Sequence, residues 1–141
     1  MKKFNHCLLV CLLALFAGCE KHSSDEVAAL EGSAAVVELI SPEETSELLK
    51  ANEGVRILDI RTPEEFSEGH IEGAVNIDYK ADNFDEEIGL LDKSVPYVVH
   101  CASGGRSGQS LPKFENSGFE KIYHLKAGFS GWADEGLPVS Q

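Results

Sequence analysis

The chain has 141 residues, of which 43% are hydrophobic, and this length suits one domain of ordinary size rather than two. The hydrophobic share is sufficient for a packed core and excludes wholesale disorder. The 24 acidic residues outnumber the 12 basic ones, which gives a formal net charge of -12. Because so acidic a surface repels nucleic acid and anionic lipid headgroups, we expect no nucleic-acid partner and interpret the charge as a solvated surface.

The amino-terminal segment has the order of a secretory signal peptide. Lys2 and Lys3 give a positive start, and residues 8–17 form an apolar run too short to span a bilayer comfortably. The following Phe16-Ala17-Gly18-Cys19 resembles the lipobox of bacterial lipoproteins, with Phe16 in place of the usual Leu. This resemblance implies cleavage before Cys19, lipid attachment to it, and a protein anchored to a bacterial membrane facing the periplasm or the cell exterior. An uncleaved membrane anchor and a soluble exported protein are the alternatives.

Export divides the chain and changes its cysteine count. We expect a signal peptide over residues 1–18, a polar tether over 19–36 and a single folded domain over 37–141. Cys7 and Cys11 would leave with the signal, and lipid would occupy Cys19. Cys101 would then be the only thiol of the folded domain, which excludes an internal disulfide. No cluster of Cys and His has the spacing of a structural zinc site, so we expect no metal.

Short apolar strands alternate with helices along the folded part. Ser41 and Thr62 each precede a proline and stand three residues before a glutamate, which is typical of a helix start with a capping box. The alternation indicates an α/β domain, a parallel sheet with helices on both faces, whose ligands bind beyond the carboxyl ends of the strands. In chain order the pattern predicts a strand over 37–40, a helix over 41–52, a strand over 55–60, a helix from Thr62, a turn over 69–73, a strand over 74–77, a helix over 80–92, a strand over 96–100, a helix over 107–116, a strand over 122–125 and a last short helix over 127–134.

Cys101 lies between a predicted strand and a predicted helix that begins at Ser107. Gly104 and Gly105 let the intervening backbone turn so that consecutive amides can surround an anion. These amides and the helix amino terminus should lower the thiol pKa, and Arg106 adds a cation suited to an oxyanion. Cys101 and Arg106 are therefore the catalytic candidates. The alternative is a purely structural role for Cys101, as a buried cysteine beside a glycine turn. The substrate-binding candidates are Ala102, Ser103, Gly104, Gly105, Arg106 and Ser107.

Three segments resemble motifs of the rhodanese family, in the same order. They are residues 59–77, which run from Asp59-Ile60-Arg61 to Gly69-His70-Ile71 and beyond, residues 100–107 around Cys101, and residues 125–132, Leu125 to Trp132. The resemblance covers about residues 37–139 and implies a rhodanese-like fold with a five-stranded parallel sheet in a single domain. It also implies a sulfurtransferase that carries sulfur as a Cys101 persulfide, with no metal or organic cofactor. Ala127 departs from the usual glycine, and Pro112 should kink the helix over 107–116.

Several residues near the predicted site have a structural and a functional interpretation. Because strand side chains alternate, His100 should point away from Cys101 as a hydrogen-bonded core histidine, with tuning of the thiol pKa as the alternative. Asp59 and Arg61 should act as caps and form ion pairs. The alternative is that they hold the site residues in place without contacting the substrate. His70 should fix its turn. Phe129 and Trp132 should pack the last helix, with a pocket wall as the alternative.

The resemblance implies transfer of sulfane sulfur from thiosulfate or a similar small anion to cyanide, a thiol or a protein acceptor, by a protein that we expect to be a monomer. One alternative is a sulfur carrier or docking module without turnover. The other is a cysteine phosphatase or arsenate reductase. Related phosphatases have Cys-x5-Arg, whereas the spacing from Cys101 to Arg106 is Cys-x4-Arg and suits a smaller sulfur substituent.

Overall fold

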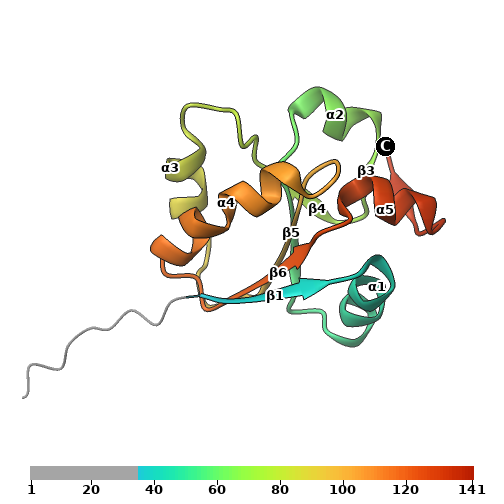
Figure 1. The fold of residues 1–141 in the computed structure, drawn as a ribbon, viewed down its shortest axis with the longest axis horizontal. Coiled ribbons are helices and arrows are strands. Elements are labelled where there is room, and N and C mark those ends of the chain that lie inside the picture. The colour runs from blue at the N-terminus through green and yellow to red at the C-terminus, as the bar shows by residue number, and fades with distance from the viewer. Residues whose placement is uncertain (1–34) are drawn as a thin grey trace, which may run out of the picture. The chain divides into compact units, whose positions relative to one another are not determined.

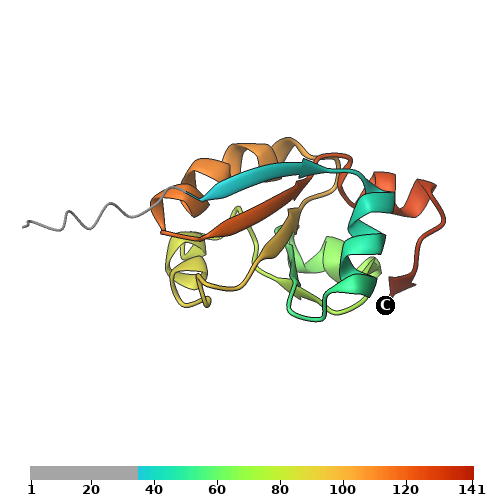
Figure 2. The same ribbon diagram turned by 90° about the horizontal axis from the view of Figure 1, so that it is seen from below.

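The computed structural model describes residues 35–141 and contains one parallel sheet with helices on both faces (Figures 1 and 2). The sheet has the strand order β1-β6-β5-β2-β4, and a separate antiparallel pair joins β3 to β7. The predicted α/β fold with five parallel strands is confirmed. The elements are β1 (Val36–Ile40), α1 (Pro42–Ala51), β2 (Arg56–Asp59), α2 (Pro63–Glu68), β3 (His70–Ile71), β4 (Ala74–Asn76), α3 (Phe84–Gly89), β5 (Tyr97–His100), α4 (Gly105–Asn116), β6 (Lys121–Leu125), α5 (Gly128–Asp134) and β7 (Val139–Ser140).

Two apolar clusters fill the space on the two faces of the sheet. The first packs α3 and α4 against one face through Phe84, Ile88 and Phe114. The second packs α1 and α5 against the other face, and the buried Trp132 of α5 belongs to it. Successive residues of β5 alternate between the clusters, since Val99 belongs to the first and Val98 to the second. The end of β5 therefore lies between the two layers of helices, in the middle of the sheet.

The two predicted capping boxes are present. Ser41 Oγ accepts the Glu44 amide at 3.2 Å, and the Glu44 carboxylate accepts the Ser41 amide at 2.9 Å. Thr62 and Glu65 make the same pair of bonds at the start of α2. Each box satisfies amides that a helix start leaves without partners, so both helices begin where the sequence predicts.

Other segments differ from the sequence prediction. The predicted turn over 69–73 contains β3, which pairs with β7, a strand that the sequence did not indicate. The helix predicted over 80–92 is shorter and comprises only α3, Phe84–Gly89. It begins later than predicted because the Asp78 carboxylate accepts the Lys80 amide and holds a turn before it. Helix α4 begins at Gly105, two residues early, and continues through Pro112 to Asn116.

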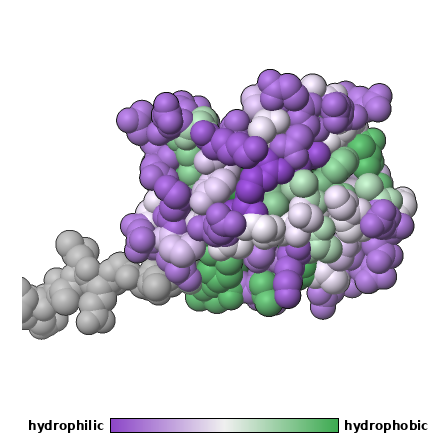
Figure 3. Space-filling model, turned by 45° about the horizontal axis from the view of Figure 1, so that its top comes forward, coloured by the Kyte–Doolittle hydropathy of each residue, from purple (hydrophilic) through white to green (hydrophobic). Residues whose placement is uncertain are grey.

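The face of the molecule drawn in Figure 3 carries many hydrophilic side chains, with apolar areas among them. On the edge strand β1, Val36 and Leu39 are 56% and 63% exposed. Within residues 35–141, no helix is long and apolar enough to cross a membrane. The same part of the chain contains no group of three or more His, Cys, Asp or Glu side chains placed to hold a metal ion. The predicted signal peptide, Cys19 and most of the predicted tether lie outside the described residues.

Candidate active site

Cys101 follows the central strand β5 directly and lies at the carboxyl ends of the parallel strands. Its side chain belongs to the apolar cluster under α3 and α4 and is only 1% exposed. The sequence prediction that Cys101 lies between a strand and a helix is confirmed. Burial alone would make this thiol inert, so its reactivity depends on the polar groups around Sγ.

Helix α5 holds the carbonyl groups of the loop that follows Cys101. The Phe129 amide donates to the Cys101 carbonyl at 2.8 Å, and the Ser130 amide donates to the Ala102 carbonyl at 2.9 Å. Because the loop carbonyls bond to α5, the next amides of the loop are free to point at Sγ. The first turn of α5 thus fixes the orientation of the peptide groups beside the thiol.

Gly104 is required by both its backbone conformation and its surroundings. Its φ is +86°, in the left-handed region, and a Cβ there would lie 1.9 Å from the Lys126 carbonyl oxygen. Gly128 has a φ of +65°, and a Cβ there would lie 2.5 Å from the Ala102 carbonyl oxygen. Gly105 has open space around its Cα. Of the two loop glycines that the sequence singles out, Gly104 is therefore the one that the tight packing requires.

The pKa of Cys101 lies below the ordinary value of a thiol. Burial raises it, but the Ser107 hydroxyl and the backbone hydrogen bonds of Ser107, Ser103 and Gly104 together lower it by more. The hydroxyl oxygen of Ser107 lies 3.5 Å from Cys101 Sγ. These donors stabilise the thiolate form of Cys101.

Arg106 lies in the first turn of α4, not in a loop before it, and its partner is Glu65 of α2. Nη1 donates to Oε2 at 2.7 Å and Nη2 donates to Oε1 at 2.6 Å. These bonds lower the pKa of Glu65 to about 2. The pKa of Arg106 is raised, chiefly by Glu65, and in smaller part by Cys101. The guanidinium is thus held next to the thiol. The sequence interpretation gave Glu65 only its capping role, and its pairing with Arg106 had no signal in the spacing.

Behind Ser107 lies His124, a residue that the sequence analysis missed. His124 is 5% exposed on β6, in register with Val99 of β5. Its Nε2 lies 2.9 Å from Ser107 Oγ. Its pKa is lowered by burial, an effect that a hydrogen bond with the Gly104 backbone opposes and the charge of Lys126 reinforces. The side chains of Cys101, Ser107 and His124 therefore form a continuous buried row. The signal for His124 was its place near the carboxyl end of a strand adjacent to β5.

Asp59 and Arg61 form a separate buried ion pair. Arg61 Nη2 donates to Asp59 Oδ2 at 2.6 Å and to the Gly69 carbonyl at 2.7 Å, and the guanidinium lies 4.0 Å from the Phe129 ring centroid. This geometry fits the structural interpretation of both residues. Through Gly69 and Phe129, the pair joins the segment after α2 to α5.

His100 lies on the opposite face of β5 from the Cys101 side chain. Its Nδ1 lies 3.2 Å from the Cys101 carbonyl oxygen, whereas its buried Nε2 has no hydrogen-bond partner and lies 3.7 Å from Asp59 Oδ2. The expectation of a core histidine satisfied by hydrogen bonds therefore holds for one ring nitrogen only. Burial lowers the pKa of His100, which keeps the ring neutral.

The remaining predicted residues pack around this centre. Trp132 is 3% exposed and donates from Nε1 to the Pro138 carbonyl. Trp132 belongs to the apolar cluster between the sheet and helices α1 and α5, and Phe129 packs against that cluster. His70 stacks on Phe66 and its Nδ1 lies 3.1 Å from the Phe66 carbonyl oxygen.

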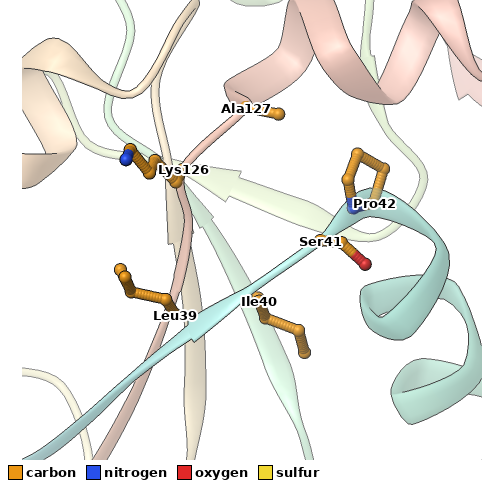
Figure 4. A pocket seen from close by; sticks show the side chains of 6 residues that line it. All are labelled: Leu39, Ile40, Ser41, Pro42, Lys126 and Ala127. Carbon is orange, nitrogen blue, oxygen red and sulfur yellow. The ribbon is translucent and has the colours of Figure 1, made fainter.

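A surface hollow opens between the carboxyl ends of β1 and β6 (Figure 4). Its lining residues are Leu39, Ile40, Ser41, Pro42, Lys126 and Ala127, and Cys101 is not among them.

Comparison with known proteins identifies the family. The profile of the Rhodanese-like domain matches residues 41–135. Thiosulfate sulfurtransferase 16 from Arabidopsis thaliana is 39% identical over 96 residues, which are 61% of this chain and 80% of that protein. Thiosulfate sulfurtransferase GlpE from Actinobacillus pleuropneumoniae is 30% identical over 100 residues, 71% of this chain and 90% of that protein. A rhodanese-related protein from Thermoplasma volcanium superposes with a TM-score of 0.64 at 27% identity and covers 73% of this chain and 97% of its own. The chain belongs to the rhodanese family, whose relatives here include named sulfurtransferases.

Proposed function

We propose that this protein transfers sulfane sulfur from thiosulfate or a similar donor to a thiophilic acceptor through a persulfide on Cys101. The observation that carries the proposal is the set of donors around the buried Sγ, which lower the thiol pKa despite burial. Relative to the thiolate, a persulfide anion adds one sulfur atom and no charge, so the donors around Sγ suit both anions. Burial favours so small a group over a tetrahedral phosphate.

The reaction has two steps. The Cys101 thiolate attacks the outer sulfur of thiosulfate, a new sulfur–sulfur bond forms, and sulfite leaves with the electron pair of the bond that breaks. The acceptor, cyanide or a thiolate, then attacks the outer sulfur of the persulfide. Thiocyanate or a new persulfide leaves, and the Cys101 thiolate is restored.

Arg106 orients the donor in this proposal. Glu65 occupies one edge of the guanidinium, so the remaining N–H groups are available to the sulfonate oxygens of the donor. The Glu65 carboxylate also keeps the guanidinium from turning away from the loop. Arg106→Lys would keep the charge but lose the planar pairing with Glu65, so we expect a higher KM for thiosulfate.

The direct test is intact mass spectrometry after incubation of the full chain with thiosulfate, followed by measurement of thiocyanate formed from cyanide. We expect one added sulfur on Cys101 and turnover in the wild type, and neither in Cys101→Ser. Wild-type protein that gains no sulfur from any sulfane donor overturns the proposal.

The same measurements separate the two rival functions. A fast first step without turnover on small acceptors favours a sulfur carrier that recognises a protein partner. Hydrolysis of an aryl phosphate, with no sulfur gain, favours a phosphatase. For the amino-terminal segment we propose export and lipid attachment at Cys19, which the mass of the mature protein isolated from its membrane would test. For the whole protein we propose a monomeric state, which its size in detergent would test.

A further inference from the structure

The hydroxyl group of Ser107 has three neighbours and only one proton to donate. Its oxygen lies 3.5 Å from Cys101 Sγ, 2.9 Å from His124 Nε2 and 3.2 Å from the Gly104 carbonyl oxygen. That carbonyl also accepts the Gly108 amide at 2.9 Å, so a bond from Ser107 would be its second. Because a charged acceptor forms the stronger hydrogen bond, a thiolate Sγ competes better than this neutral carbonyl, and the Ser107 proton is then decided between Sγ and Nε2.

The proton on His124 settles this choice. If Nε2 carries no proton, it accepts from Ser107, and the thiolate loses its side-chain donor. If Nε2 carries a proton, it donates to Ser107 Oγ, and the hydroxyl proton turns to Sγ. A negative Sγ favours the second arrangement, in which each bond of the row polarises the next.

We propose that His124 is a positioning residue that donates from Nε2 to Ser107 Oγ and so directs the Ser107 hydroxyl onto the Cys101 thiolate. The inference rests on the proposed role of Cys101 as the nucleophile and adds the residue that orients its side-chain donor. His124 does not touch a substrate. The other charged or titratable groups near the row are Arg106, Lys126, His100 and, through Arg106, Glu65.

The test compares His124→Gln with His124→Asn in the full chain. A Gln amide can occupy the place of Nε2, whereas an Asn amide is one methylene shorter and does not reach Ser107. The readout is the rate at which iodoacetamide alkylates Cys101 between pH 5 and 9, followed on the Cys101 peptide by mass spectrometry. This chemistry needs no sulfur donor, so its outcome is independent of whether thiosulfate is a substrate.

We expect His124→Asn to slow alkylation at pH 6 about tenfold by raising the thiol pKa, and His124→Gln to retain most of the wild-type rate. Ser107→Ala should slow it as much as His124→Asn, and the double variant Ser107→Ala/His124→Asn no further, because both act through one hydroxyl. His70→Gln, outside the row, should leave the profile unchanged. Equal profiles for the Asn and Gln variants, or losses that add in the double variant, overturn the proposal. A sulfur-transfer assay on the same samples reports separately on the proposed function.

Discussion

The Glu65 carboxylate joins two helices by accepting from Arg106 and from Thr62 at once. Oε2 accepts both Arg106 Nη1 at 2.7 Å and the Thr62 amide at 3.1 Å, while Oε1 accepts Arg106 Nη2 at 2.6 Å. One side chain thereby caps α2 and fixes the first turn of α4, although 41 residues separate it from Arg106. The capping box and the site cation share a single carboxylate.

This pair predicts a loss of stability in acid. The folded pKa of Glu65 is about 2, below its ordinary value of 4.5. Its contribution is therefore fully present above pH 4.5 and is lost as the pH falls from 4.5 toward 2. Because both side chains are partly exposed, solvent screening reduces that contribution to about 1 kcal/mol. In urea unfolding, the free energy of unfolding of the wild type should exceed that of Glu65→Gln by this amount at pH 6. The difference between the two proteins should shrink at pH 3. The neighbouring Glu64→Gln, which removes an exposed carboxylate from the same helix turn, should show no such change. A Glu65 difference that is constant with pH would contradict the assignment.

The buried pair of Asp59 and Arg61 predicts an asymmetry between removing one charge and removing both. Arg61→Met leaves the Asp59 carboxylate buried without its cation and should cost about 3 kcal/mol or more of unfolding free energy. In the double variant Asp59→Asn/Arg61→Met, neither of these two buried side chains carries a charge. The side-chain oxygen of the new Asn can still accept a hydrogen bond from the backbone amide of residue 61. The double variant should therefore be more stable than Arg61→Met, as measured by urea unfolding. Arg56→Met, at the exposed start of β2, is the matched control and should stay within about 0.5 kcal/mol of wild type. A double variant less stable than Arg61→Met would refute this account.

Gly104 and Gly73 separate the effect of conformation from that of contact. Both have a positive φ, +86° and +80°, but only at Gly104 would a Cβ meet backbone, the Lys126 carbonyl. Gly73→Ala should cost about 1–2 kcal/mol for the left-handed conformation alone. Gly104→Ala should cost more and should also slow alkylation of Cys101, because the loop must move. Thermal unfolding and the alkylation rate measure the two effects, and equal results for the two variants would show that the contact is unimportant.

Ala127 and Gly131 should compensate one another. A Cβ at Gly131 would lie 2.3 Å from the Ala127 Cβ. Gly131→Ala should therefore destabilise the protein by about 1–3 kcal/mol, and the double variant Ala127→Gly/Gly131→Ala should recover much of that loss. Gly89→Ala, in a helix position with open space, should be neutral or slightly stabilising. Additive losses in the double variant, by thermal unfolding, would rule out this contact as the cause.

The sequence predicted the parts of the fold that local chemistry determines. Capping boxes at Ser41 and Thr62 and the alternating strands depend on neighbours along the chain, so their elements were placed to within a few residues. Strands β3 and β7 are short, and their pairing joins residues 70 and 140, which no local pattern indicates. The short α3 was overestimated because the Asp78 turn competes with the helix.

For the site, the sequence identified the loop but not what surrounds it. Cys101, Gly104 and Ser107 were recognisable because they lie together in the chain. Glu65 and His124 come from α2 and β6, and only the folded sheet brings them to Arg106 and Ser107. The residues that the prediction missed are therefore those whose contacts are distant in the sequence.

The dependence of the Cys101 loop on Phe129 and Ser130 has a consequence for the order of folding. The amides that hold the loop carbonyls belong to α5, which follows the loop in the chain. These two hydrogen bonds can form only when α5 has packed beside the loop. A chain in which α5 is still unfolded therefore lacks the bonds that orient the peptide groups beside the thiol. The surroundings of Cys101 thus report on whether α5 is in place.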